Sequence, residues 1–125
     1  MKYDYNLLVI GGGAAGFFSA ISAAENASTM KIGLLEKTGK LLSKVRVSGG
    51  GRCNVTNAQN QLKAFSKSYP RGEKFIYKLL HQFNQENTVQ WFADRGVKLH
   101  AEPDGRMFPI SNDSASIVDC LMDAA

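Results

Sequence analysis

The hydrophobic pattern near the start of the chain predicts a strand, a helix and a second strand. Residues Asn6 to Ile10 form a short apolar run closed by three glycines, which is typical of a buried strand in a parallel sheet. From Ala14 to Asn26, small and apolar residues recur at the spacing of one helix face. A second apolar run covers 32–35 and ends at Glu36. This order predicts an α/β fold that opens with one right-handed βαβ unit.

Periodicity weakens after this unit and returns at Glu73. Residues 37–72 contain repeated glycines and polar segments, so we expect a long irregular stretch that is functional or mobile. A helix is predicted from Glu73, and its apolar residues are expected to form a core face: Phe75, Ile76, Leu79, Leu80 and Phe83. Asn87 or Thr88 is expected to cap a short helix that stops at Gly96.

The last third of the chain predicts a hairpin followed by a helix. Residues 97–101 alternate like a half-buried strand, and Pro103, Asp104 and Gly105 have turn chemistry, so 106–110 is expected to fold back as the partner strand. Ser111, Asn112 or Asp113 is the expected cap of the final helix. Its apolar stripe is expected to contain Ile117, Val118, Leu121 and Met122, and the sequence ends within this helix.

Composition adds limits to this picture. A chain of 125 residues with 44% hydrophobic residues fits one small globular domain. Cys53 and Cys120 lie far apart and have no metal-spaced histidines, so neither a metal site nor a disulfide framework is predicted. No secretory signal and no membrane-spanning run is apparent, which favours a cytoplasmic protein.

The charge of the chain suits an anionic ligand. The formal net charge is +4, from 15 Lys and Arg against 11 Asp and Glu, and the basic residues are densest between Lys37 and Arg52. The alternative is that these are ordinary solvated surface side chains.

Gly11, Gly13 and Gly16 form a GxGxxG motif between the first strand and the first helix. In such a motif the first glycine permits a tight turn, the second lets a pyrophosphate approach the backbone, and the third lets the helix pack closely on the strand. Glu36 follows Gly16 by 20 residues, where an acidic residue binds a ribose 2′-hydroxyl and repels a 2′-phosphate. The pattern therefore predicts NAD or FAD rather than NADP; the alternative is a purely structural turn.

A second glycine run extends from Ser48 to Asn54. Gly49, Gly50 and Gly51 offer consecutive amides without side chains, a shape suited to phosphates or a flavin edge. Arg52 is a candidate to neutralise a phosphate or a carboxylate. The alternative is a flexible loop.

These motifs resemble one known group of enzymes. GGGAAG, SGGGRCNVTN, YPRG and GRMFP look like the BaiN-like, or YhiN-type, FAD-dependent oxidoreductases, also labelled aminoacetone oxidases. The resemblance runs from Tyr5 to the last residue, about the first third of the family's usual length. It implies a Rossmann-like FAD-binding βαβ unit of the glutathione-reductase type. Residues 1–125 would then be the N-terminal part of an FAD/NAD(P)-binding domain, without its C-terminal strands and inserted domain.

The resemblance and the glycine motifs together give the candidate cofactor-binding residues. They are Gly11, Gly12, Gly13, Ala14, Ala15, Gly16, Glu36, Lys37, Lys44, Ser48, Gly49, Gly50, Gly51, Arg52, Cys53 and Asn54. Residues 41–46 lengthen the link between Glu36 and the second glycine run compared with many members, which leaves the phosphate role of Lys44 or Arg46 open.

No catalytic residue is assigned from the sequence. Cys53 lacks a CxxxxC partner, because position 58 is alanine, so it is expected to be a packed residue near the flavin. His81 and His100 have no acidic partner by spacing and are expected to be structural. The leading hypothesis is a flavoprotein oxidoreductase with NAD(P)H as a possible electron donor. The alternatives are an inert nucleotide-binding fragment and a flavin-dependent tRNA-modifying enzyme; no nucleic acid or membrane partner is expected.

Overall fold

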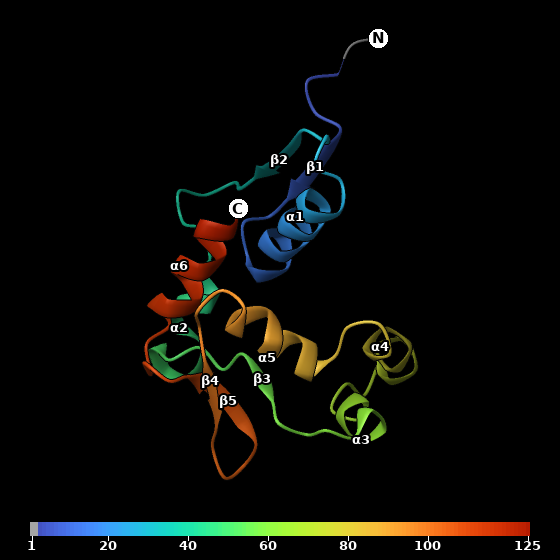
Figure 1. Cartoon of the computed structure of the whole chain (residues 1–125), viewed down its shortest axis with the longest axis vertical. Coiled ribbons are helices and arrows are strands. Elements are labelled where there is room, and N and C mark those ends of the chain that lie inside the picture. The colour runs from blue at the N-terminus through green and yellow to red at the C-terminus, as the bar shows by residue number, and fades with distance from the viewer. Residues whose placement is uncertain (1–2) are drawn as a thin grey trace.

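The first third of the chain forms the predicted βαβ unit. The computed structural model describes residues 3–125 and shows strand β1 (Leu7–Ile10), helix α1 (Ala14–Asn26) and strand β2 (Ile32–Leu35) in this order (Figure 1). The two strands pair in parallel, with Leu7 opposite Ile32 and Ile10 opposite Leu35. Helix α1 packs on both strands and buries Phe17 and Ile21. This part of the prediction is confirmed.

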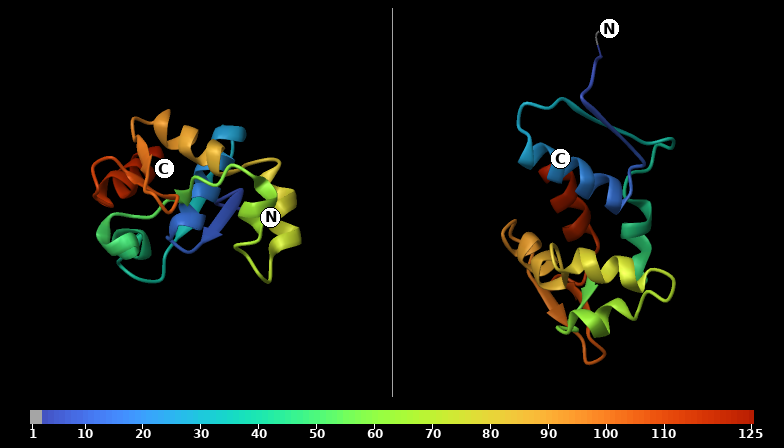
Figure 2. Two further views of the ribbon diagram at one scale, coloured as in Figure 1. Left: turned by 90° about the horizontal axis from the view of Figure 1, so that it is seen from below. Right: turned by 90° about the vertical axis from the view of Figure 1, so that its right-hand side faces the viewer.

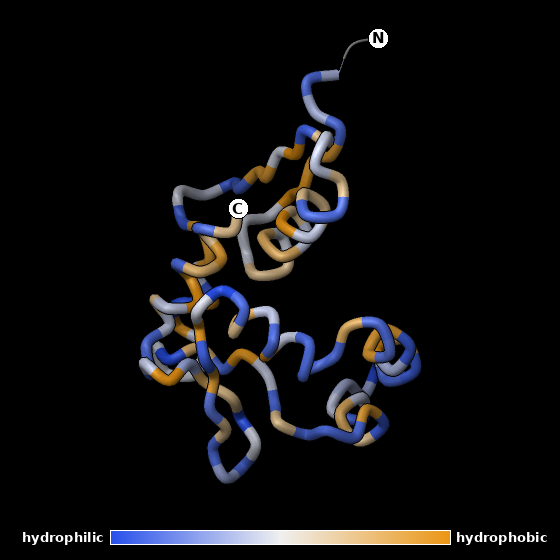
Figure 3. The backbone as a smooth tube through the Cα atoms, in the orientation of Figure 1, coloured by the Kyte–Doolittle hydropathy of each residue, from blue (hydrophilic) through white to orange (hydrophobic). Residues whose placement is uncertain are grey.

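Strand β1 is less buried than the sequence predicts. Leu8 is 50% exposed and Ile10 is 79% exposed, and Leu35 on β2 is 50% exposed. These side chains lie on the face of the sheet that α1 does not cover. In Figure 3 the backbone of both strands is coloured as apolar along most of its length. The expectation of a strand buried on both faces is therefore wrong for residues 3–125.

Residues 37–72 are more regular than predicted. They contain helix α2 (Ser43–Gly51), the short strand β3 (Thr56–Asn57) and helix α3 (Leu62–Ser66). Helix α2 forms because Leu42 and Val45 are both buried in the core, and it is interrupted by non-helical backbone at Ser48, Gly49 and Gly50. The expectation of a wholly irregular stretch is corrected, since tertiary packing holds helices too short to show in the sequence pattern.

Helix α4 (Glu73–Leu80) forms as predicted but does not bury the expected face. Leu80 is buried, whereas Phe75 is 67% exposed and Leu79 and Phe83 are also exposed. Figure 1 shows α3 and α4 together at one side of the molecule, away from the other helices. The core-face expectation is therefore confirmed for Leu80 and wrong for Phe75 and Leu79, which face outward.

Helix α5 (Gln85–Ala93) starts earlier than predicted. Asn84, rather than Asn87 or Thr88, is the N-cap, and its side chain accepts hydrogen bonds from the amides of Glu86 and Asn87. Asn87 completes a capping box by accepting from the Asn84 amide. The helix runs into a turn at Gly96, whose φ is +81°.

The predicted hairpin and final helix are both present. Strands β4 (Leu99–Ala101) and β5 (Arg106–Pro109) pair antiparallel, and β3 joins them in a sheet of order β3-β5-β4. Helix α6 (Ala115–Ala124) buries three of its four predicted apolar residues, while Met122 is 43% exposed. Its N-cap is Ser114 and not residues 111–113; the Asp113 carboxylate nevertheless accepts from the Ala115 amide.

The core lies where α1, α2, α5 and α6 meet. Its members from these helices include Phe17, Ile21, Phe92 and Val118, and α6 lies against α1 (Figure 2). This packing fixes the start of α1, which follows the first glycine motif, relative to the second glycine run. Within residues 3–125, no helix has the length and apolar content that a membrane crossing needs.

Candidate functional site

The first glycine motif is a tight turn that leaves no room for side chains at its end. Gly11 has φ +109°, and its amide donates to the Leu35 carbonyl at 2.7 Å. A Cβ at Gly16 would lie 1.8 Å from the Gly11 carbonyl oxygen, which no side chain can do. Close packing of α1 on β1 therefore requires glycine at position 16.

Gly13 presents the start of α1 to an open space. It is the N-cap of the helix, makes no side-chain cap, and a Cβ there would meet nothing within 4 Å. The first-turn amides of Ala14, Ala15 and Gly16 have no carbonyl four residues earlier within the helix, and the first turn carries no acidic side chain. Unpaired amides and the positive end of the helix dipole make this position suitable for a phosphate.

Glu36 lies at the tip of β2, directly beside this turn. One carboxylate oxygen accepts from the Gly12 amide at 2.8 Å, and the other accepts from the amide and hydroxyl of Thr38 at 2.8 and 3.0 Å. The Thr38 amide, and next the Gly12 amide, lower the pKa of Glu36 below its usual range. The side chain is therefore ionised at neutral pH, and its remaining lone pairs can accept from ribose hydroxyls.

The second glycine run adopts a backbone that only glycine takes easily. Gly49, Gly50 and Gly51 have φ values of +57°, +68° and +87°. A Cβ at Gly49 would lie 2.7 Å from the Phe108 ring, whereas Gly50 and Gly51 face open space. We call residues 48–54 the second glycine loop.

Ser114, just before α6, anchors the second glycine loop. Its amide donates to the Gly51 carbonyl and its hydroxyl donates to the Arg46 carbonyl, both at 2.9 Å. Ser114 is 6% exposed, so these bonds are shielded from water. The loop is thus held in place rather than flexible.

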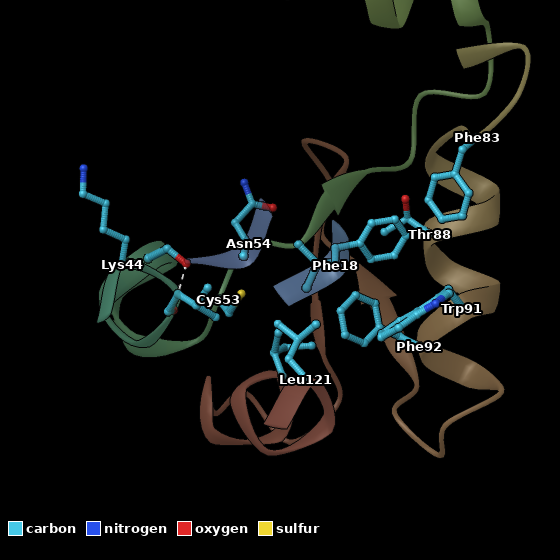
Figure 4. Close-up of a pocket in the computed structure, with 14 residues that line it drawn as sticks. Phe18, Lys44, Cys53, Asn54, Phe83, Thr88, Trp91, Phe92 and Leu121 are labelled. Atoms are coloured by element: carbon cyan, nitrogen blue, oxygen red, sulfur yellow. Dashed lines mark hydrogen bonds between the residues drawn. The ribbon is translucent and has the colours of Figure 1, made fainter. Parts of the chain in front are cut away.

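A cavity of about 510 Å³ lies between the first turns of α1 and the second glycine loop. Ala14 reaches it from α1, and Lys44, Ser48, Cys53 and Asn54 reach it from α2 and the second glycine loop (Figure 4). Its other lining residues are mostly apolar: Phe18, Val45, Val55, Phe83, Thr88, Trp91, Phe92, Ile117 and Leu121. A mostly apolar cavity with a few polar groups is the usual form of a cofactor or ligand site.

Sequence reasoning missed the aromatic side of this cavity. The Phe18 ring lies 5.2 Å from that of Phe83 and 5.4 Å from that of Trp91. Helical periodicity assigns such residues to a core, and it does not show which of them face a cavity. The apolar spacing at 75–83 included Phe83 but gave no sign that it meets Phe18 at the cavity.

The remaining candidate residues lie outside the cavity. Lys37 is exposed beyond the tip of β2. The Arg52 guanidinium points to the hairpin, where it pairs with Glu102. Their contacts with a cofactor stay predictions.

The lining of the cavity contains no histidine and no carboxylate in the part of the chain that the structure describes. Cys53 is a free, buried thiol, and burial raises its pKa above the usual value, which favours the protonated form. His81 stacks edge-on against Tyr77, and the ring of His100 lies 3.3 Å from the Asn112 side-chain oxygen. This arrangement suits cofactor binding rather than acid–base chemistry by these residues.

Comparison with known proteins identifies one matching family and several similar proteins. Residues 5–125 match the HI0933-like protein Rossmann domain. The chain is 31% identical to the 3-dehydro-bile acid delta(4,6)-reductase of Clostridium scindens over 113 residues, which cover 90% of this chain and 27% of that protein. It is 32% identical to the ribosomal RNA dihydrouridine synthase of Escherichia coli over 120 residues, covering 95% of this chain and 28% of that protein.

The same name recurs in a third relative. The ribosomal RNA dihydrouridine synthase of Haemophilus influenzae is 27% identical over 107 residues, 86% of this chain and 25% of that protein. The chain thus spans about a quarter of the length of these relatives. The βαβ unit, the glycine turn and the match over residues 5–125 lead to one conclusion: the chain belongs to the HI0933-like family and forms part of its Rossmann domain.

Proposed function

We propose that this chain is the FAD-binding N-terminal segment of a flavoprotein oxidoreductase. The observation that carries the proposal is the pairing of an unobstructed helix start at Gly13 with the ionised Glu36 carboxylate beside it. The first can hold a pyrophosphate and the second the adenosine ribose.

The second glycine loop and the cavity make the site longer and more apolar than NAD binding requires. They extend the site from Ala14 past Ser48, Cys53 and Asn54 to an aromatic wall. This length and apolar character favour the flavin half of FAD over a nicotinamide. Bound FAD would supply hydride or electron transfer, while the protein binds and orients it. NAD(P)H as the electron donor remains part of the proposal.

The names of the relatives support a reaction class. One name describes a reductase of delta(4,6) double bonds, and the other describes synthesis of dihydrouridine, which has two more hydrogens than uridine. Both are reductions of carbon–carbon double bonds. We infer the same class of reaction for the protein that contains this chain.

A second candidate is that the substrate is a uridine in RNA. Two relatives bear the name ribosomal RNA dihydrouridine synthase. In addition, Lys37, Lys40, Lys44 and Arg46 are exposed and lie along the chain between the two glycine motifs. Binding of RNA to the full-length protein, weakening steeply as salt rises, would favour this candidate over a small-molecule substrate.

A flavin spectrum of the full-length protein tests the proposal directly. We expect a yellow protein with flavin absorbance bands. A colourless protein that does not bind added FAD and binds NAD would refute it.

The alternative of an inert fragment is tested by comparing the turnover of residues 1–125 with that of the full-length protein. Equal turnover would exclude that alternative.

A further inference from the structure

The side chain of Arg52 turns away from the cavity and toward the hairpin. Its Nη1 lies 2.5 Å from Glu102 Oε1, and its guanidinium lies over the Phe108 ring at 3.9 Å from the centroid. Its Nε also donates to the carbonyl of Gly49 at 3.4 Å. Arg52 therefore connects the second glycine loop to β5 and to the turn before it.

Glu102 pairs with two arginines at once, one through each carboxylate oxygen. Its second oxygen pairs with Arg106 Nη2 at 3.0 Å, and the Arg106 guanidinium also lies near the Phe108 ring, at 5.5 Å. The Glu102 side chain is 22% exposed and that of Arg52 is 34% exposed, so water screens the pair only in part. Without Glu102, Arg106 would keep its pairing with Asp104, whereas Arg52 would lose its carboxylate partner.

The hairpin contacts the second glycine loop directly as well. Phe108 is fully buried, and its ring occupies the space that a side chain at Gly49 would need. The Glu102 amide donates to the Arg106 carbonyl at 2.8 Å, which fixes the carboxylate within the turn. The position of the loop thus depends on a hairpin about 50 residues away in the sequence.

We propose that Glu102 is a positioning residue for the flavin half of the site. Through Arg52 it holds the second glycine loop in the shape that lines the cavity. The proposal rests on the proposed function, because it assumes that FAD binds there. The competing explanation is that Arg52 itself binds a cofactor phosphate, in which case Glu102 competes with the cofactor for Arg52.

The two explanations predict opposite effects of one substitution. Under our proposal, Glu102→Gln in the full-length protein weakens FAD affinity roughly tenfold. If Arg52 binds phosphate, the same change frees Arg52 and leaves FAD affinity equal or higher. Arg52→Met weakens binding in both cases and so does not separate them. The double variant tests instead whether Glu102 acts through Arg52, and we expect it to bind FAD no worse than the weaker single variant. Additive losses would overturn the proposal.

Measuring ADP affinity distinguishes a positioning role of Glu102 from a general loss of structure in the Glu102 variants. ADP reaches only the first glycine motif and Glu36, so we expect Glu102→Gln to leave ADP affinity unchanged. Glu102→Asp keeps the carboxylate, so we expect it to retain part of the FAD affinity that Glu102→Gln loses. An equal loss of ADP and FAD affinity would overturn the proposal. Asp104→Asn is the matched control, since Asp104 is exposed and, within residues 3–125, pairs with Arg106 and not with Arg52. A wild-type protein that binds ADP but not FAD would contradict the proposed function itself.

Discussion

Gly13 lies at the proposed phosphate position and Gly39 does not, so valine at each position should affect FAD binding differently. At both positions a Cβ would meet no atom within 4 Å, and neither glycine needs a positive φ. Gly13→Val should therefore leave the fold intact but fill the space for the pyrophosphate, weakening FAD affinity by about 10- to 100-fold, as for overpacked sites. Titration of the full-length protein with FAD measures this, and Gly39→Val is the control. Equal affinities in both variants would argue against a phosphate at Gly13.

Ionisation of Glu36 should make the stability of the folded protein depend on pH in the acid range. Its pKa is lowered in the folded state, so its contribution is complete above the unfolded value near 4.5 and is lost as pH falls through the lower folded value. Glu36→Gln should thus lower the melting temperature at neutral pH, and the gap to wild type should narrow below about pH 4.5. Asp119→Asn, which removes an exposed carboxylate on α6, is the matched charge-removal control for this comparison. A gap that widens in acid would contradict the hydrogen bonds to Gly12 and Thr38.

At the scale of residues, the sequence predicts features that depend on near neighbours. The need for glycine at position 16 follows from the motif, because the atom that excludes a side chain belongs to Gly11 in the same turn. The partner of Arg52 could not be predicted in this way. Glu102 is 50 residues away, and only the folded hairpin brings it within reach.

The capping box of α5 gives a prediction at the scale of elements. Asn84→Ala removes the acceptor for two amides at the start of the helix, and should destabilise the protein by about 1 kcal/mol. Urea unfolding of the full-length protein measures this change. Asn60→Ala is the control, because Asn60 is exposed and makes no hydrogen bond within residues 3–125. A loss in the control equal to that in Asn84→Ala would refute the capping role.

Elements with a strong local signal were predictable, and elements held by packing were not. The βαβ unit and the β4–β5 hairpin follow from apolar runs, glycines and turn residues. Helix α2 could not be predicted, because its sequence is rich in glycine and its stability comes from Leu42 and Val45 in the core. The caps of α5 and α6 were each misplaced, since several neighbouring residues in both regions are able to cap a helix.

The open face of the β1–β2 sheet gives a prediction for the whole molecule. Parallel sheets are normally covered on both faces, yet Leu8, Ile10 and Leu35 are half or more exposed. Residues 1–125 prepared alone should therefore self-associate, and Ile10→Lys should reduce this. Light scattering over a concentration series measures it, with Val47→Lys, an exposed apolar residue on α2, as the control. A segment that stays monomeric at all concentrations would contradict the prediction.

The arrangement of the whole molecule was the least predictable level. The sequence of α4 has the same amphipathic pattern whether its apolar face meets this chain or another part of a longer protein. The structure shows part of that face exposed, with Phe75 most open, although Leu80 is buried. Likewise, the apolar spacing of α5 did not distinguish core residues from those that line the cavity.

The hydrogen bonds of Ser114 limit how the length of the connection before α6 can change during evolution of this family. It fixes the second glycine loop from the position just before α6, and α6 in turn packs against α1, which starts at the first glycine motif. One residue inserted between Pro109 and Ser114 would move Ser114 relative to the Gly51 and Arg46 carbonyls that it now binds. The separation of the two loops would then no longer suit the same ligand. Homologous genes should therefore conserve the length of this short connection even where its amino acids diverge.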